Sequence, residues 1–206
     1  MLRILGRKNS SNVQKVMWCI GELGLACERQ DVGGAFGGTD LPDYLARNPN
    51  ALVPTLEEGG FVLWESNAIV RYLAAKYGMD ELYPADLRSR MSAERWMDWQ
   101  LGTVNPPMWA LFFNLVRVAP KARDRGAVAR ARDEAIKYFR ILDSELADRD
   151  YLIGDRLTIA DIAMGVMAYR FFGLPIDRPS LPHAEAWYDR LTARQAYRTH
   201  VMLPLD

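Results

Sequence analysis

Apolar and polar positions follow two different patterns along this chain, and the change between them divides it. Up to about residue 77, short apolar runs with the length of β-strands, such as residues 2–5, lie between amphipathic helical segments. Beyond residue 88 only helical periodicity is found. The pattern therefore predicts an α/β part followed by an all-helical part.

The α/β part begins with a strand, a helix and a second strand. Strands are predicted at residues 2–5 and 28–32, and the apolar residues between them recur at helical spacing. Two parallel strands joined by a helix form a right-handed βαβ unit. A glycine-rich link and a short helix at residues 41–46 follow.

Residues 53–73 combine a hairpin with the start of a helix. Short apolar runs at 55–57 and 61–64 flank two glycines, which can adopt the positive φ angles of a tight turn. Ser66 is predicted as the N-cap of the following helix. The resulting order, βαβαββα, predicts a four-stranded mixed sheet with helices on both faces.

The boundary between the two parts is predicted at residues 79–88, a linker after which no strand pattern appears. This gives an α/β domain at residues 1–78 and an all-helical domain at residues 89–206. In the helical domain, an apolar stripe over residues 97–115 predicts a long helix that Pro106-Pro107 must kink or interrupt.

A second well-marked helix start lies at Thr158. Thr158 is predicted as the N-cap and Asp161 as its partner in a capping box, with Leu157 and Ile162 as a hydrophobic staple. The helix that follows is apolar on all sides, which is typical of the centre of a bundle. We expect Asp161→Ala to cost about 1 kcal/mol or more in folding stability through loss of the cap.

Composition excludes several classes of function. The chain is 50% hydrophobic, and Lys plus Arg and Asp plus Glu both number 26. A chain without net charge has no general attraction for nucleic acid or an anionic membrane. No apolar run approaches the roughly 20 residues of a membrane span, and the first residues resemble a strand and not a signal peptide. We therefore expect a cytoplasmic protein.

The cysteines and histidines indicate no metal site. Cys19 and Cys27 form neither a Cys-x-x-Cys motif nor a ligand pattern with His183 or His200. Cys19 lies on an apolar helix and is interpreted as a small core residue. We expect no metal and no prosthetic group.

The loop that enters the first helix contains Ser10, Ser11 and Asn12 but no cysteine. A helix N-terminus lowers the pKa of a thiol, so a reactive cysteine would be expected there in a disulfide-exchange protein. A hydroxyl at this place can instead donate a hydrogen bond to a thiolate that a ligand supplies. Capping of the helix is the alternative role for these residues.

These motifs resemble the glutathione transferase superfamily. Val53-Pro54 before the hairpin and Glu65-Ser66 at the following helix are similar to its glutathione-binding half, and the capping box is similar to that of its helical domain. The resemblance covers about residues 1–200 and is closest to theta-like bacterial members. It implies a thioredoxin-like N-terminal domain and an all-helical C-terminal domain.

The resemblance implies glutathione as co-substrate. Glu65 would meet the ammonium group of the γ-glutamyl part and Ser66 its carboxylate, which agrees with the preference of anions for helix N-termini. Val53, before a cis Pro54, would bind the cysteinyl part through its backbone. Thr39 and Leu52 stand where relatives often bind the glycyl carboxylate with basic or amide groups.

That carboxylate has other candidate partners in Asn12, Arg7, Lys8 or water. For the thiolate, the family pattern places a serine six residues before the valine that starts the apolar face, which matches Ser10 and Val16. Ser11 is the rival, and Asn12 or a backbone N–H can share the role.

The pocket for the second substrate would lie between the domains. Its predicted residues on the long helix are Trp99, Thr103, Trp109 and Arg117. Arg117 can recognise an acidic or halogenated substrate, and a surface arginine is the alternative. Aromatic residues at helical spacing are also typical of a core.

The resemblance thus implies a glutathione transferase that adds glutathione to small hydrophobic electrophiles in detoxification. A homodimer is implied by the family alone. Glutathione-dependent dehalogenation, isomerisation or peroxide reduction at the same site is the first alternative, and a non-catalytic ligand-binding module is the second. Ser10, Glu65 and Ser66 together argue against the second alternative, because a scaffold does not need them.

Overall fold

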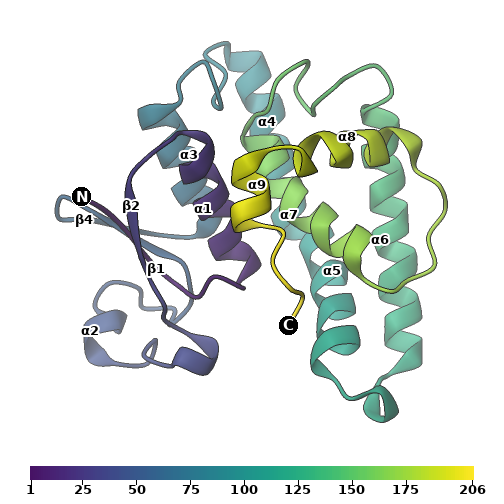
Figure 1. Cartoon of the computed structure of the whole chain (residues 1–206), viewed down its shortest axis with the longest axis horizontal. Coiled ribbons are helices and arrows are strands. Elements are labelled where there is room, and N and C mark those ends of the chain that lie inside the picture. The colour runs from purple at the N-terminus through teal and green to yellow at the C-terminus, as the bar shows by residue number, and fades with distance from the viewer.

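The computed structural model describes residues 1–206 and confirms an α/β part followed by helices (Figure 1). The first part contains β1 (Leu2–Leu5), α1 (Ser11–Glu22), β2 (Cys27–Gln30), η1 (Gly34–Phe36), α2 (Pro42–Leu45), β3 (Thr55–Glu58), β4 (Phe61–Trp64) and α3 (Ser66–Tyr77). The second contains α4 (Leu87–Trp99), η2 (Gln100–Val104), α5 (Asn105–Phe112), η3 (Phe113–Arg117), η4 (Pro120–Ala122), α6 (Arg125–Glu145), α7 (Ile159–Gly173), α8 (Pro182–Thr192) and α9 (Gln195–His200). None of these helices has the length and apolar character that a membrane span requires.

The strands form the predicted four-stranded mixed sheet in the order β2-β1-β3-β4. β1 is parallel to β2 and antiparallel to β3, and β3 and β4 form the hairpin. β2 ends at Gln30, two residues before the predicted end. Beyond it the chain pairs only irregularly with the loop after β1, for example through Arg7 N and Val32 O at 3.0 Å.

Helices cover both faces of the sheet, as the alternation of its side chains requires. Ile4 and Leu56 are fully buried in the main core, to which α1 and α3 contribute. Leu5, next to Ile4, points to the other face and packs with Tyr44 of α2. The candidate functional site described below lies at the end of the sheet where α1 begins.

The predicted long helix is present, and π turns interrupt its α-helical pattern beside the two prolines. Residues 87–117 run on without a break through α4, η2, α5 and η3, and η2 and η3 are π-helical. Pro106 and Pro107 lack the N–H that would bond to the preceding turn, and the wide π turn of η2 lies directly before them. The helix therefore continues through the two prolines, with a π turn directly before them.

The predicted start of α3 also needs a correction. Ser66 is the first helical residue and is buried, whereas Glu65 holds the N-cap position with a φ angle of 72°. No side chain caps this helix. The Ser66 hydroxyl therefore makes no capping hydrogen bond to the free N–H groups at the start of α3.

The capping box before α7 is confirmed. Thr158 N donates to Asp161 Oδ2 at 2.8 Å, and Leu157 and Ile162 are both buried in the core. Asp161 also accepts bonds at 2.9 Å from Leu152 N and Trp187 Nε1. Asp161 thus ties the start of α7 to the loop before it and to α8.

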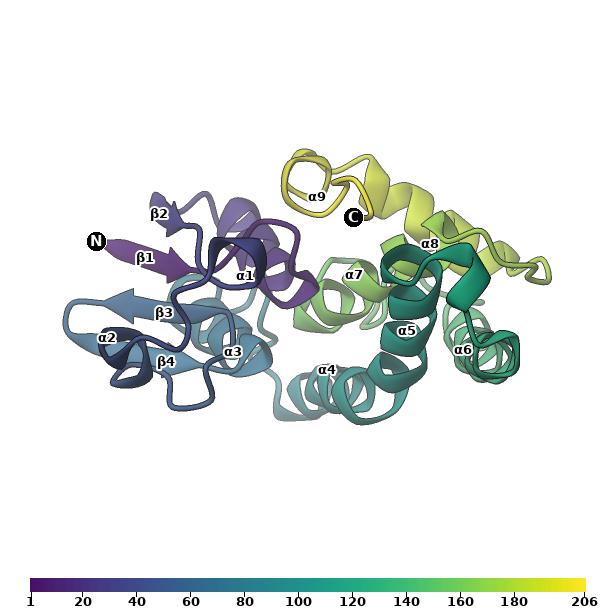
Figure 2. The same ribbon diagram turned by 90° about the horizontal axis from the view of Figure 1, so that it is seen from below.

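One continuous core of buried side chains joins the two parts of the chain. Figure 2 shows the helices that contribute to it, with α1 of the first part beside α7 of the second. The rings of Trp18 on α1 and Tyr197 on α9 lie edge to face with centroids 4.7 Å apart. Arg194 forms an ion pair with Glu22 of α1 at 2.7 Å. These contacts fix α1, which carries the predicted hydroxyl at its start, against helices of the second part. The division of the chain at residues 79–88 stays a prediction.

Candidate functional site

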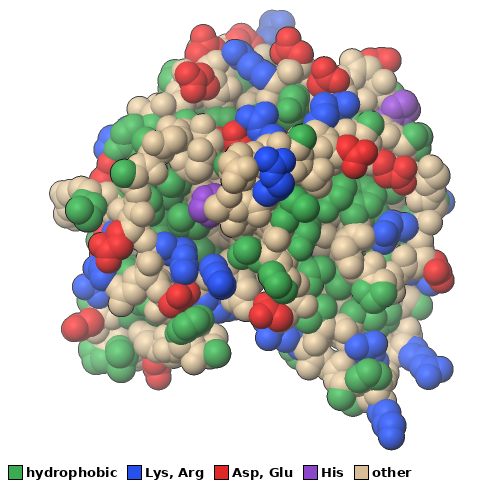
Figure 3. Space-filling model, in the orientation of Figure 1, with side chains coloured by type: hydrophobic (Ala, Val, Ile, Leu, Met, Phe, Trp, Pro, Cys, Tyr) green, Lys and Arg blue, Asp and Glu red, His purple; other side chains and the backbone are tan.

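A cavity of about 660 Å³ lies between the two parts of the chain. Its walls are the loop before α1, residues 33–39, the turn at 51–53 and the helical residues of α5, η3 and α7. Figure 3 shows the notch between the lower ends of the two lobes on this side of the molecule. Both halves of the sequence therefore contribute to one site.

Ser10 lies at the N-cap position of α1 and lines this cavity. Its side chain makes no capping bond, although Gln14 N donates to its carbonyl at 2.8 Å. The first turn of α1 contains no acidic residue that would neutralise the positive end of the helix. Ser11 and Asn12 line the same cavity. All three predicted polar residues thus meet at one helix start.

Val53 also lines the cavity, and its peptide bond to Pro54 is cis. Neither the N–H nor the C=O of Val53 bonds within the protein. Main-chain groups left open beside a strand can bind an extended peptide, as an added strand would. Thr39 lines the wall next to this segment.

Glu65 and Ser66 lie at the start of α3, outside the lining of this cavity. Glu65 is exposed and has φ 72° and ψ 111°. A non-glycine residue in this region costs about 1–3 kcal/mol and is typically kept at binding sites. The first turn of α3 has no acidic residue, so its free N–H groups can bind a carboxylate.

Lys15 is a fully buried lysine that was not predicted from the sequence. Lys15 Nζ donates to Asn67 Oδ1 at 2.8 Å and to Gln100 Oε1 at 3.3 Å. Burial lowers the pKa of Lys15 to about 7, and the nearby Glu65 partly opposes this. The network connects α1, α3 and η2. A single lysine within a helix gives no sequence signal that it is buried.

The helical wall of the cavity is aromatic and basic. Trp109 and Phe113 stack with ring centroids 5.1 Å apart. Arg117 lines the cavity with them and donates to the main-chain oxygen of Asp206, whose side chain accepts from Asn9 at 3.1 Å. The predicted Trp109 and Arg117 therefore lie in one wall.

Trp99 and Thr103 do not line this cavity, which corrects the predicted pocket wall. Trp99 packs edge to face against Trp96 and Tyr138 and faces a different hollow near α6. Thr103 lies within the π turn η2. The extra residue in that turn shifts the helix faces, so spacing counted along an ideal α-helix fails here.

Arg170 on α7 was not predicted as a site residue, yet it lines the cavity. It is only 7% exposed, and its Cζ lies 4.1 Å from the centroid of the Phe112 ring. Burial and the charges of Arg117 and Arg7 lower its pKa to about 10. Arg170 is the one basic residue of α7, whose only other charged residue is Asp161 of the capping box, and this was the signal that could have identified it.

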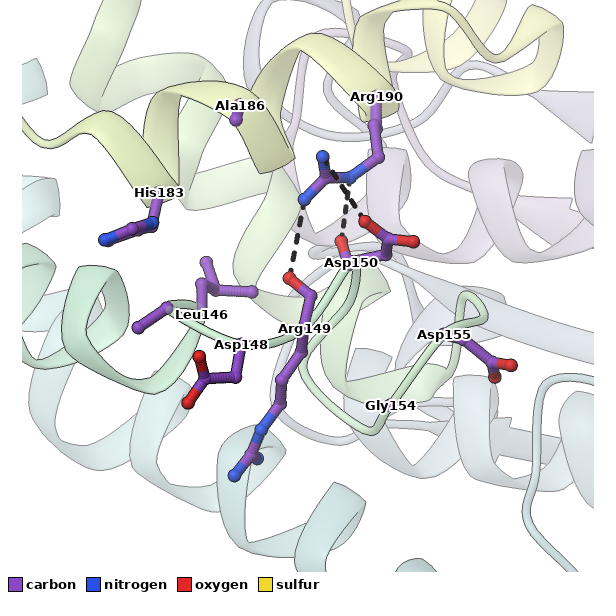
Figure 4. Close-up of a pocket in the computed structure, with 10 residues that line it drawn as sticks. Leu146, Asp148, Arg149, Asp150, Gly154, Asp155, His183, Ala186 and Arg190 are labelled. Carbon is purple, nitrogen blue, oxygen red and sulfur yellow. Dashed lines mark hydrogen bonds and ion pairs between the residues drawn. The ribbon is translucent and has the colours of Figure 1, made fainter.

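A second hollow of about 610 Å³ lies between α8 and the loop after α6 (Figure 4). Its Arg190 donates to the carbonyl of Asp150 at 3.0 Å and forms an ion pair with the side chain of Asp150 at 3.5 Å. Arg190 and Asp150 thus satisfy each other. No group of His, Cys, Asp and Glu in the structure has an arrangement that could hold a metal.

The sequence matches two family models, described as "Glutathione S-transferase, N-terminal domain" over residues 5–81 and "Glutathione S-transferase, C-terminal domain" over residues 104–195. It is 40% identical over the full length of both chains to glutathione S-transferase GstB of Escherichia coli strain K12. It is 33% identical to glutathione S-transferase 3 of Zea mays over 99% of this chain and 95% of that one.

Solved structures agree with these sequence matches. The theta class glutathione S-transferase of the citrus canker pathogen Xanthomonas axonopodis pv. citri, with glutathione bound, superposes with a TM-score of 0.96 at 47% identity. The match covers 100% of this chain and 99% of that one. The similarity therefore extends over both halves of the cavity.

Proposed function

This chain belongs to the glutathione S-transferase family, and from that premise we propose that it activates the thiol of glutathione and transfers glutathione to a small hydrophobic electrophile. The observation that carries the proposal is Ser10, a hydroxyl without a capping role at a helix start that lines the cavity. A hydrogen bond from Ser10 and the positive end of α1 would both favour the thiolate over the thiol. The thiolate is the form that attacks electrophiles.

The proposed pose divides glutathione among three segments. The γ-glutamyl part would lie at the start of α3, with its carboxylate on Ser66 and its ammonium group near Glu65. The open main-chain groups of Val53 support binding of the cysteinyl part beside Ser10.

The glycyl part would then lie near Thr39 and Arg7. The Arg7 side chain runs along the backbone of the cavity loop, since a Cβ built on Gly34 would lie 3.0 Å from its Cδ and Nε. Arg7 is thus the basic group that supports binding of the glycyl carboxylate, while Ser11 and Asn12 stay the alternatives to Ser10 at the sulfur.

We also propose a cytoplasmic homodimer. The edge strand β4 exposes Phe61, Val62 and Trp64, which are 45%, 37% and 39% exposed. Neighbouring exposed apolar side chains on an edge strand favour a protein interface. Light scattering tests this proposal: the mass of two chains in the wild type, and of one chain in Trp64→Lys, is the expected result.

Conjugation of glutathione to chlorodinitrobenzene tests the proposed function. We expect kcat/KM to fall about 10-fold or more in Ser10→Ala and its pH profile to move to higher pH, because the thiolate loses a hydrogen bond. Ser11→Ala is the matched control and should stay near the wild-type rate. Equal rates in all three proteins would assign the role to Asn12 or to the backbone. No conjugation and no retention of the wild type on immobilised glutathione would contradict the proposal.

A further inference from the structure

Three arginines line the cavity, and its walls contain no acidic side chain. Arg7 comes from the loop before α1, Arg117 from η3 and Arg170 from α7. Neither Arg7 nor Arg170 takes part in any ion pair of the protein. The charges that act on Arg170 are those of Arg117 and Arg7, and both repel it. The cavity therefore carries an excess of positive charge.

Arg170 is the strongest indication that this charge serves a ligand. It is more than nine-tenths buried, and its guanidinium group stacks on Phe112 without donating a hydrogen bond to any acceptor of the protein. A buried cation costs free energy unless an anion or hydrogen-bond acceptors compensate it. The protein supplies none here, and Arg170 lines the cavity, so its guanidinium group is available to an anion that enters there in place of solvent.

Arg117 lies on the same side of the site. Its Cζ is 5.7 Å from the centroid of the Phe112 ring against which Arg170 stacks. The acidic residue that comes near it is Asp206, which offers Arg117 a main-chain oxygen and directs its carboxylate to Asn9. Arg117 thus already has an oxygen acceptor, while Arg170 has none.

The position of the two arginines separates them from the proposed glutathione pose. Arg7 runs along the cavity loop of the first part, where the glycyl end would lie. Arg117 and Arg170 belong to helices of the second part and share their wall with the stacked pair Trp109 and Phe113. A planar guanidinium group favours a carboxylate, which it can bind through two hydrogen bonds.

We propose that Arg117 and Arg170 bind a carboxylate of the second substrate, so that the preferred electrophiles are small anionic molecules with an aromatic or apolar body. This proposal rests on the proposed transferase function. In the reaction, the thiolate sulfur attacks the carbon that bears a halide, a C–S bond forms, and the C–halide bond breaks as halide leaves with its electron pair. The thiol proton passes to solvent, and the carboxylate is unchanged.

The test compares two electrophiles that differ in charge, chlorodinitrobenzoate and the neutral chlorodinitrobenzamide. For each protein, kcat/KM is divided by the uncatalysed rate constant, and the ratio of the benzoate value to the benzamide value is the selectivity. We expect this selectivity to fall about 10-fold or more in Arg117→Gln and in Arg170→Gln, the usual effect of losing a charged hydrogen bond. Arg170→Lys, which keeps the charge, should retain part of it.

Arg95→Gln is the matched control, since Arg95 is an exposed arginine outside the cavity, ion-paired with Glu145 at 4.0 Å. It should keep the wild-type selectivity. Because Arg117 is exposed, its variant stays informative if Arg170→Gln does not fold. Unchanged selectivity with conjugation of both electrophiles would overturn this inference alone. A raised KM for glutathione with unchanged selectivity would assign the arginines to the glycyl carboxylate and also overturn it. Absence of any conjugation would instead contradict the proposed function.

Discussion

Lys15 on α1 donates a hydrogen bond of 2.8 Å to Asn67, the residue that follows Ser66 on α3, and both residues are buried. Asn67 in turn contacts α4, because its Nδ2 donates a hydrogen bond to the carbonyl of Met97 at 2.9 Å. The lysine thereby connects the two helices whose starts form the proposed glutathione site to the second part of the chain.

The buried lysine predicts a pH-dependent stability. The pKa of Lys15 is about 7 in the folded state, because burial disfavours its charge, and about 10.5 in the unfolded chain. Between these values the unfolded chain binds a proton that the folded protein does not. This group therefore makes the free energy of unfolding rise with pH, by at most about 1.4 kcal/mol per pH unit, and its contribution is constant below the folded pKa.

The measurement is denaturant unfolding of the wild type and Lys15→Met between pH 6 and about pH 10. We expect the wild type to gain stability relative to the variant as the pH rises above about 7. Lys121→Met, at an exposed lysine, should follow the wild type at every pH. A constant difference between wild type and Lys15→Met would show that Lys15 keeps the same charge in both states.

Asp161→Ala should destabilise the protein more than loss of an ordinary cap. Its carboxylate accepts bonds from Leu152 N, Thr158 N, Thr158 Oγ1 and Trp187 Nε1, all in buried surroundings. Donors left without an acceptor in the core add to the lost bonds, so we expect a loss of about 3 kcal/mol in unfolding free energy.

The control for this variant is Asp124→Ala. Asp124 caps α6 at an exposed position and accepts from Ala127 N at 2.9 Å. Its loss should cost about 1 kcal/mol. Similar losses in the two variants would show that the extra bonds of Asp161 contribute little, and both folded proteins should keep their activity.

We expect the positive φ angle of Glu65 to lower the free energy of unfolding, and its side-chain carboxylate to bind glutathione. Glycine adopts the φ angle of 72° without strain, so Glu65→Gly should be about 1 kcal/mol more stable than Glu65→Ala. Both variants should lose retention on immobilised glutathione to the same extent, because both lack the carboxylate. If Glu65→Gly were still retained on immobilised glutathione, this result would contradict the proposed contact between Glu65 and the γ-glutamyl ammonium group.

Local sequence signals predicted most of the fold. The strands, the hairpin, the helix after it and the capping box at Thr158 each depend on residues close together in the chain, so periodicity and turn chemistry were sufficient. The N-cap of α3 was predicted one position too late, at Ser66 and not at Glu65. Glu65 takes this position with an unusual positive φ angle, which its residue type does not indicate.

The site was predicted less completely, for a different physical reason. Ser10 and Val53 could be identified because motifs mark them. Lys15 is a charged residue that only the three-dimensional packing buries, and sequence patterns assign such residues to the surface. Arg170 did have a signal, its place in an almost wholly apolar helix, but the sequence analysis did not use it. Trp99 packs against the core and not in the cavity wall, which agrees with the alternative that aromatic residues at helical spacing are typical of a core.

The core shared by α1, α7 and α9 limits how this protein can release its product. A hinge between the two parts would have to separate Trp18 from Tyr197 and Glu22 from Arg194, and thereby expose packed apolar surface. The cavity loop at residues 33–38 has no such restraint: none of its side chains joins the main core, and its four glycines all have positive φ angles. We expect the entrance to open by movement of this short loop, on the nanosecond to microsecond timescale typical of loops.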